Sequence, residues 1–286
     1  MSLLSALPGC MPSFILSSGT PVSGTLALFF MQFAAYSRYY DLLYQDKNYR
    51  GETAYIIDLL SRYDNECHTL LELGCGTGIH ASLLAEAGFD VTGVEISESM
   101  LKQALLRAAD VSGRITKGAF NAVQGNALTV RVEQSFDAVV SLFHVVSYQT
   151  TNSDVQKMFE TASTHLKPGG VFLFDVWYGP AVVHMRPVVR VKRMDNESIR
   201  VLRIAEPQLN MNDNRVDVTY TVLITEKATG RVEQLTEEHH MRYYFAPELS
   251  LLAQSAGMVI TRSEEWMTGN APSELTWGVT FVARKT

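Results

Sequence analysis

Residues 69–78 read Thr-Leu-Leu-Glu-Leu-Gly-Cys-Gly-Thr-Gly, and this stretch decides the fold. Its apolar residues predict a short buried strand that ends abruptly in the glycine-rich turn Gly74–Gly78. From Ile79 to Gly88, apolar residues then recur at helical spacing. A strand, a tight glycine turn and a helix in this order predict the first unit of a doubly wound α/β sheet. Ligands of such sheets bind beyond the carboxyl ends of the strands.

The spacing of the glycines separates two classes of ligand. A dinucleotide-binding turn has the pattern G-x-G-x-x-G/A, and its last position here is Ile79. The turn reads G-x-G-x-G instead, with Glu72 two residues ahead of the first glycine. A second strand pattern, Phe89–Glu95, ends in an acid 17 residues after Gly78. A carboxylate at this strand tip can accept hydrogen bonds from both hydroxyls of a ribose.

Together, Glu72, Gly74, Gly76, Gly78 and Glu95 resemble the motifs of the class I S-adenosylmethionine (SAM) methyltransferases. The resemblance implies an α/β fold with a Rossmann-like, doubly wound, seven-stranded sheet, and SAM as the cofactor. The alternative is a generic Rossmann-like unit that binds a nucleotide such as NAD. The cofactor-binding residues that the resemblance implies are Tyr44, Glu72, Gly74, Cys75, Gly76, Thr77, Gly78, Glu95, Ile96, Met100, Gly125, Asn126, Ala127, Ser141, Leu142 and Phe143.

Composition and charge limit the kinds of partner that the chain is expected to bind. The net charge of −6 argues against a protein that follows nucleic-acid phosphates, which normally requires a basic surface. The three cysteines (Cys10, Cys67 and Cys75) give no disulfide framework and fit a reducing cytoplasm. Residues 1–37 contain no Lys, Arg, Asp or Glu, and their apolar run at Leu26–Phe33 is too short for a membrane anchor. We expect residues 1–35 to be a loosely attached leader, and we assign no metal ligands.

Further along the chain, the pattern changes twice. Residues 36–182 are expected to form the SAM-binding core with N-terminal helices in the region Tyr36–Tyr63, and with strands at Asn121–Gln124, Phe136–Ser141 and Val171–Asp175. Ser97 is a suitable cap for a helix at Glu98–Ala109, and Lys167–Gly170 is expected to end the helix before Val171.

From residue 183 to residue 245, alternating polar and apolar residues predict an antiparallel β insertion of about three or four strands after the fifth core strand, with turns at Asn210–Asn214 and Ala228–Gly230. Residues 246–286 are expected to supply a C-terminal helix and a hairpin that complete the core sheet, with its first strand at Met258–Glu265.

A narrower resemblance covers roughly residues 36–284. Tyr40-Asp41-Leu42-Leu43-Tyr44 and Asp46-Lys47-Asn48-Tyr49 look like the N-terminal segment of the N,N-dimethyltransferases that act on dTDP-linked amino sugars. The likeness continues through residues 95–101, 141–143 and 175–178. It implies methyl transfer to the amine of a small, nucleotide-linked sugar. Two positions depart from the pattern, since Asn126 replaces an expected acid and His144 stands where small polar residues are usual.

The chemistry requires a neutral amine, because an ammonium cannot attack a methyl group. His144 or Tyr148, in the loop after Phe136–Ser141, could accept the proton, and Tyr36 is a third catalytic candidate. Aromatic rings such as those of Tyr36, Tyr40 and Trp177 could favour the sulfonium by cation–π contact. The expected substrate-binding residues are Tyr40, Trp177, Tyr178, Arg186 and Arg242.

Basic residues gather at positions 186–203, and arginine suits a diphosphate because its fork donates two hydrogen bonds. A solvated strand face is the alternative interpretation of this run. Two other functions also stay open: a methyltransferase for another small acceptor, such as a glycine-like amine or a hydroxyl, and a SAM- or NAD-binding module without turnover. The β insertion is a possible surface for a homodimer.

Overall fold

The structure is a computed structural model that describes residues 40–64 and 66–286. The helices are α2 (Tyr40–Leu43), α3 (Tyr49–Ser61), α4 (Ile79–Glu86), α5 (Glu98–Ser112), α6 (Asn152–His165), α7 (Gly179–Met185) and α8 (Ala246–Ser255), with a 3₁₀ helix η1 (Val145–Tyr148). Within these described ranges, no helix is both long and apolar enough to cross a membrane. The expected leader, residues 1–35, lies outside the described residues.

The strands follow the predicted alternation with helices in the first half of the chain. They are β1 (Thr69–Leu73), β2 (Asp90–Glu95), β3 (Ala119–Gln124), β4 (Phe136–Ser141), β5 (Leu166–Tyr178), β6 (Arg190–Asp195), β7 (Ile199–Asn210), β8 (Arg215–Glu226), β9 (Val232–Tyr244), β10 (Met258–Glu265) and β11 (Gly278–Lys285). Ser97 begins α5 as predicted, because its hydroxyl accepts a hydrogen bond from the Met100 N–H at 3.4 Å.

The central strands lie in the order β3-β2-β1-β4-β5 and are parallel. On the far side of β5, β11 is antiparallel and pairs with β10. The predicted α/β fold with a mostly parallel central sheet is therefore confirmed. The strands β3, β2, β1, β4, β5, β11 and β10 make up seven, and the end of β5 also pairs with β9 at Trp177 and Tyr178, so the insertion joins them in one sheet of eleven described strands.

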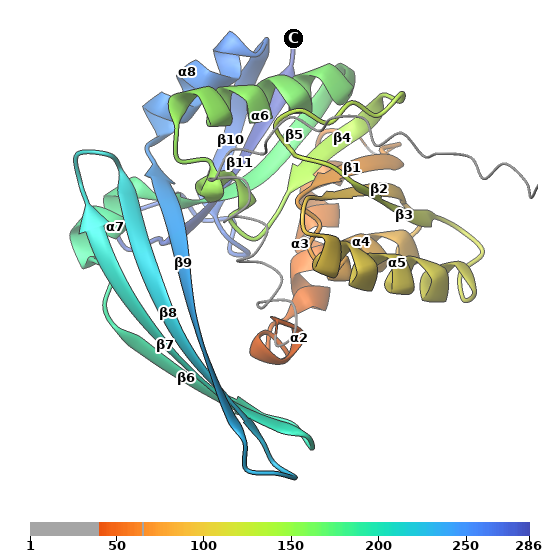
Figure 1. Cartoon of the computed structure of the whole chain (residues 1–286). Helices are drawn as coiled ribbons and strands as arrows, with labels where there is room; N and C mark the ends of the chain where they lie inside the picture. Colours follow the sequence, from red (N-terminus) through yellow and green to blue (C-terminus); the bar gives the residue numbers. More distant parts are fainter. Residues whose placement is uncertain (1–39, 65) are drawn as a thin grey trace, which may run out of the picture.

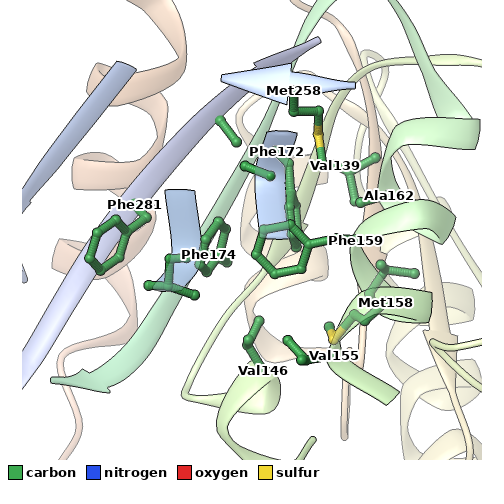
Figure 2. Packing of buried hydrophobic residues seen from close by; sticks show 14 of the residues in the cluster. Val139, Val146, Val155, Met158, Phe159, Ala162, Phe172, Phe174, Met258 and Phe281 are labelled. Carbon is green, nitrogen blue, oxygen red and sulfur yellow. The ribbon is translucent and has the colours of Figure 1, made fainter. Parts of the chain in front are cut away.

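Helices cover both faces of this sheet. Leu71 and Leu73 of β1 pack into one apolar cluster with α6 and α8, whereas Leu70 packs into another with α3, α4 and α5. Burial on both faces explains why the parallel strands are almost continuously apolar in sequence. Figure 2 shows the first cluster, in which the fully buried ring of Phe159 lies 5.4 Å from Phe172 and 5.2 Å from Phe174 between ring centroids.

We expect Phe159→Ala to lower the free energy of unfolding by about 3–5 kcal/mol, because the ring is fully buried and its removal leaves a cavity. Urea denaturation followed by circular dichroism measures the change. Leu251→Ala is the matched control, since Leu251 lies on α8 with 68% of its surface exposed. An equal, small effect in both variants would show that this cluster is not the core.

The alternating segment forms four long antiparallel strands, β6 to β9, within the predicted residues 183–245. Figure 1 shows them curving away from the helix-covered part of the sheet. Two apolar clusters attach them to the rest of the chain: Leu43 and Met100 pack against Met194, and Val182 of α7 packs against Val216. The turns expected at Asn210–Asn214 and at Ala228–Gly230 separate β7 from β8 and β8 from β9.

Two local details were not predicted from the sequence. The helical region expected from Tyr36 to Tyr63 is broken, because the Asn48 side chain accepts a hydrogen bond from the Gly51 N–H at 3.0 Å and so begins a new helix, α3. This break turns residues 44–48 toward the site described below. The helix α6 ends before Lys167–Gly170, as expected, but β5 begins already at Leu166 and includes these residues, and its pairing with β4 shifts register between Phe136 and Ala138.

Candidate active site

The glycine turn after β1 adopts the backbone that its sequence predicts. Gly74, Gly76 and Gly78 have φ values of 79°, 58° and 79°, which favour glycine over residues that carry a Cβ. A Cβ on Gly74 would also lie 2.6 Å from Cγ1 of Val145. A Cβ on Gly76 would meet nothing within 4 Å, so the space above this residue is open to a ligand.

Glu95 lies at the tip of β2, beside this turn. Its two carboxylate oxygens accept hydrogen bonds from the Gly76 N–H at 2.9 Å and the Ser97 N–H at 2.8 Å. Burial raises the pKa of Glu95, and the backbone hydrogen bonds oppose that shift. The carboxylate therefore holds the glycine turn against β2. Each of its oxygens has a second lone pair that remains available for the ribose hydroxyls predicted from the sequence.

Glu72 and Cys75 are buried beneath the turn. Burial and the nearby charge of Glu95 raise the pKa of Glu72 to about 8, and its Oε2 has no hydrogen-bond partner among the described residues. Burial also raises the pKa of the Cys75 thiol well above its usual value, so this cysteine stays protonated and packs under Gly93. Its side chain is a small filler of the turn.

The remaining cofactor candidates line the same edge of the sheet or support it. Asn126 follows β3, but its Oδ1 accepts a hydrogen bond from the Leu128 N–H at 2.9 Å, so the side chain stabilises the loop after β3. Ser141 is fully buried, and its hydroxyl donates to the Leu73 carbonyl at 3.0 Å. Met100 packs against the antiparallel strands. The candidates that lie at the carboxyl ends of the strands or in the turns beside them are Thr77, Ile96, Gly125, Ala127 and Leu142.

After β4, the chain makes an unusual turn. Phe143 and His144 both have positive φ values, 64° and 63°, which are rare for residues with a side chain. The turn presents the ring of Phe143 to Tyr44, with centroids 4.9 Å apart, and to the ammonium of Lys47 at 4.4 Å. Tyr44 and Phe143, both predicted cofactor contacts, thus lie side by side. Backbone strain of this kind is typical of functional sites.

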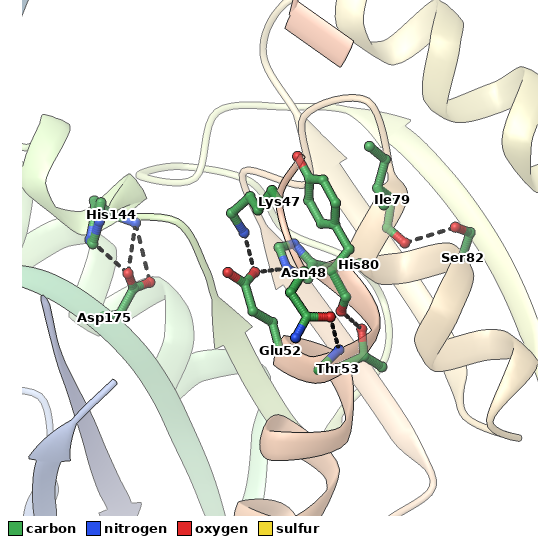
Figure 3. A network of polar contacts seen from close by, with 11 residues as sticks. Lys47, Asn48, Glu52, Thr53, Ile79, His80, Ser82, His144 and Asp175 are labelled. Carbon is green, nitrogen blue, oxygen red and sulfur yellow. Dashed lines mark hydrogen bonds and ion pairs between the residues drawn. The ribbon is translucent and has the colours of Figure 1, made fainter. Parts of the chain in front are cut away.

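His144 is paired with Asp175, a buried carboxylate near the end of β5. The His144 N–H donates to both carboxylate oxygens, at 3.2 and 3.1 Å, and the ring Nδ1 lies 2.7 Å from Oδ2. The ring Nδ1 does not have the geometry of a hydrogen bond to this oxygen, so His144 and Asp175 form an ion pair when the imidazole is protonated. Figure 3 shows this pair beside a second network of Lys47, Glu52 and His80.

Both networks border one cavity of about 330 Å³. Its lining residues come from the N-terminal segment, the ends of β4 and β5, and the loop before β11: Lys47, Glu52, Phe143, His144, Asp175, Glu265, Trp266, Thr276, Trp277 and Gly278. The sequence predicted only Phe143 and His144 of this set as site residues. Asp175 ends the strand expected at Val171–Asp175, and an acid at the carboxyl end of a parallel strand was the signal that could have identified it.

Tyr148, the second candidate base, is placed differently. It does not line the cavity, and its hydroxyl is hydrogen-bonded to Nδ1 of His239 on β9 at 2.8 Å. Burial of the hydroxyl raises its pKa well above the usual value, which disfavours the phenolate that a base would need. The geometry supports a structural role for Tyr148, connecting η1 to the antiparallel strands.

We therefore expect Tyr148→Phe to leave kcat and SAM affinity essentially unchanged and to lower the free energy of unfolding by about 1 kcal/mol, the net value of one hydrogen bond. Steady-state kinetics and thermal denaturation measure the two effects. A large loss of kcat in a variant that folds normally would restore Tyr148 to the catalytic set.

The predicted substrate residues separate into two groups. Trp177 lies near the cavity, with its ring 6.3 Å from His144 and 5.8 Å from Trp277 between centroids, and Tyr178 follows it with its N–H donated to the Trp277 carbonyl at 2.9 Å. Arg242 is instead buried in an ion pair with Glu248 of α8, and Arg186 is exposed at the end of α7. Of Tyr40, only its position in α2 is described, and Tyr36 lies outside the described residues.

The basic residues of the β insertion do not form one cluster. Strand pairing sets Lys192 opposite Arg203 and the next residue, Arg193, opposite Leu202, so neighbouring positions face opposite sides of the sheet. Lys192 binds Asp46 at 2.9 Å, and Arg203 lies over the ring of Tyr220 at 4.6 Å, whereas Arg193 and Arg200 are exposed. The basic residues therefore alternate between the two faces of the strands, as the alternative interpretation of this run predicted.

The observed residues fit SAM. The open space above Gly76 lies beside Glu95, where a ribose would be held, and one buried carboxyl oxygen of Glu72 has no partner among the described residues. Carboxyl groups of Glu95 and Asp175 lie on either side of the glycine turn along the edge of the sheet, and negative charge there suits a sulfonium cation. When bound, SAM supplies a methyl group on a positively charged sulfur.

Comparisons with known proteins agree with this geometry. The model of the methyltransferase domain family matches residues 70–170. A dTDP-3-amino-3,4,6-trideoxy-alpha-D-glucopyranose N,N-dimethyltransferase from Streptomyces venezuelae is 29% identical over 233 residues, which cover 80% of this chain and 92% of that protein.

Two crystal structures share the fold over most of the chain. A SAM-dependent methyltransferase from Clostridium acetobutylicum has a TM-score of 0.74 at 20% identity, covering 90% of this chain and 99% of that one. DesVI from Streptomyces venezuelae has a TM-score of 0.72 at 24% identity, covering 88% and 98%. The family match and the S. venezuelae relative, together with the glycine turn and the acid at the tip of β2, identify a SAM-dependent methyltransferase that resembles the dTDP-amino-sugar N,N-dimethyltransferases, and the two crystal structures show that they share its fold.

Proposed function

We propose that the chain transfers methyl groups from SAM to the amine of an amino sugar carried on a nucleotide of the dTDP type. Two kinds of similarity support this substrate class. The S. venezuelae relative acts on a dTDP-amino sugar, and its similarity extends over 233 residues, well beyond the shared methyltransferase domain at residues 70–170. The single structural observation that carries the proposal is the His144–Asp175 pair at a cavity next to the cofactor edge of the sheet.

His144 is suited to remove the proton from the incoming amine. Its Nδ1 is turned to Asp175, so the other ring nitrogen remains to accept a proton. The carboxylate of Asp175, only 2% exposed, stabilises the imidazolium that forms. The deprotonated amine then has the lone pair that in-line attack requires, and the rings of Phe143 and Trp177 contact the His144 ring beside it. Alignment of the two reactants supplies the rest of the acceleration.

A methyl-transfer assay tests this function. The chain is incubated with SAM and a panel of dTDP-linked amino sugars, and products are analysed by mass spectrometry; the matching dTDP-sugars with a hydroxyl in place of the amine are controls. We expect a gain of one or two methyl groups on amino sugars alone. No gain across the panel would reject the substrate class, and equal methylation of the hydroxyl controls would reject N-methylation.

We also propose a homodimer formed through the β insertion. Strand β6 is the last strand of the sheet order, so one of its edges lacks a neighbouring strand among the described residues. Val188 and Val189, just before β6, and Val191, within it, are 60%, 61% and 48% exposed. Exposed valines beside an unpaired edge favour association with a second copy. Light scattering after size exclusion measures the state; a monomeric wild-type chain would contradict the dimer, and Val191→Lys should dissociate it.

A cytoplasmic location is proposed with this function. Among the described residues, Cys67 and Cys75 form no disulfide, which is usual for a protein of a reducing compartment.

A further inference from the structure

The order of the strands gives the spatial order of the candidate residues along one edge of the sheet. From β3 to β5, the carboxyl ends carry Asn126, Glu95, the glycine turn, Phe143 and Asp175 in that order. With the ribose at Glu95 and the acceptor at His144–Asp175, the cofactor's sulfur lies between them, near the ends of β1 and β4. The amino-acid arm of SAM, which ends in a carboxylate, leaves the sulfur in this same region.

Lys47 is the cation that the structure places there. It precedes α3 in the segment that turns inward at the Asn48 cap, and its side chain is 13% exposed. Its ammonium lies 4.4 Å from the ring centroids of both Phe143 and Tyr49. Burial lowers the pKa of Lys47, and the charges of Glu52, Asp175 and Glu72 oppose that shift. Glu72 lies in β1, Phe143 follows β4 and Asp175 lies in β5, so the ammonium lies near the carboxyl ends of these three strands.

The hydrogen bonding of Lys47 is incomplete. An ammonium has three N–H donors, and among the described residues Lys47 makes one hydrogen bond, to Oε2 of Glu52. That oxygen is shared, because Nε2 of His80 also lies 2.7 Å from it. A buried ammonium with donors to spare, beside a cavity, is suited to a second carboxylate.

We propose that Lys47 binds the α-carboxylate of the amino-acid end of SAM. The Glu52 carboxylate, itself held by His80, keeps the ammonium in place, and Phe143 and Tyr49 shield the ion pair from water. Lys47 thereby fixes the arm of the cofactor that lies opposite the adenosine. This assignment rests on SAM as the cofactor but does not depend on which acceptor is methylated.

Two ligands that differ in the carboxylate-bearing arm test the proposal by calorimetry. S-adenosylhomocysteine carries the arm, and 5′-methylthioadenosine lacks it while keeping the adenosine and the sulfur. We expect Lys47→Met to weaken S-adenosylhomocysteine binding about 10- to 100-fold, the usual effect of losing a charged hydrogen bond, and to leave 5′-methylthioadenosine binding unchanged. Arg50→Met is the matched control, because Arg50 lies three residues away with its side chain 81% exposed.

Each other outcome has a defined meaning. Unchanged binding of S-adenosylhomocysteine would overturn the proposal, and so would an equal loss for both ligands, since the effect would then not concern the carboxylate. Retained 5′-methylthioadenosine binding shows that the variant folds, and Lys47→Arg should recover most of the affinity because it keeps the positive charge. No acceptor is present in these titrations, so their result stands apart from the outcome of the methyl-transfer panel.

Discussion

His144→Ala is expected to lower kcat by about 10²–10⁴-fold, the range that general-base catalysis contributes. Affinity for SAM should change little, because His144 points into the cavity at the ends of β4 and β5 rather than toward Glu95. The loss should lessen at high pH, where the substrate amine is already neutral. Steady-state rates measured across pH at saturating SAM give both quantities.

Asp175→Asn separates two explanations of that loss. The amide keeps the size of the carboxylate but removes the charge that faces the His144 ring, so kcat should fall in this variant as well. Since the two residues act as one unit, the double variant should be no slower than His144→Ala alone. A loss in His144→Ala that persists unchanged at every pH would indicate that the residue positions the substrate instead. Wild-type rates in both single variants would remove this pair from the catalytic site.

Glu95→Ala is expected to weaken SAM binding by about 1.5–3 kcal/mol, the scale of a hydrogen bond to a charged group. The structure adds a second reason for the loss, because the carboxylate also holds the Gly76 and Ser97 N–H groups that shape the turn. Calorimetric titration with SAM measures the change. Glu98→Ala, in the first turn of α5 and exposed, is the matched control. Unchanged affinity in Glu95→Ala would place the ribose anchor elsewhere.

The sequence predicted the parts of the fold that are determined locally. The glycine turn, the acid ending β2, the Ser97 cap and the bounds of β4 and β10 follow from spacing, caps and apolar runs, and the structure confirms them. The break between α2 and α3 was not predicted, because the run of aromatic residues continues through it. Only the cap made by Asn48 reveals a new helix, and an Asn in a helical pattern is a weak signal.

The acceptor side of the site was harder to predict for a different reason. Its cavity brings together residues from positions 47 to 278, and such long-range neighbours leave no local pattern. Arg242 was expected to bind the substrate, and the fold instead places Glu248 against it, six residues along the chain on α8. Tyr148 was likewise assigned by its place in a loop, and its hydroxyl faces β9 instead.

A crystal structure with S-adenosylhomocysteine and a dTDP-amino sugar bound together tests the central claim most directly. The account predicts the ribose of the cofactor at Glu95, its carboxylate at Lys47, and the sugar nitrogen in the cavity within hydrogen-bond distance of His144, in line with the sulfur. A sugar nitrogen bound outside this cavity, for example on the outer face of the antiparallel strands, would contradict it.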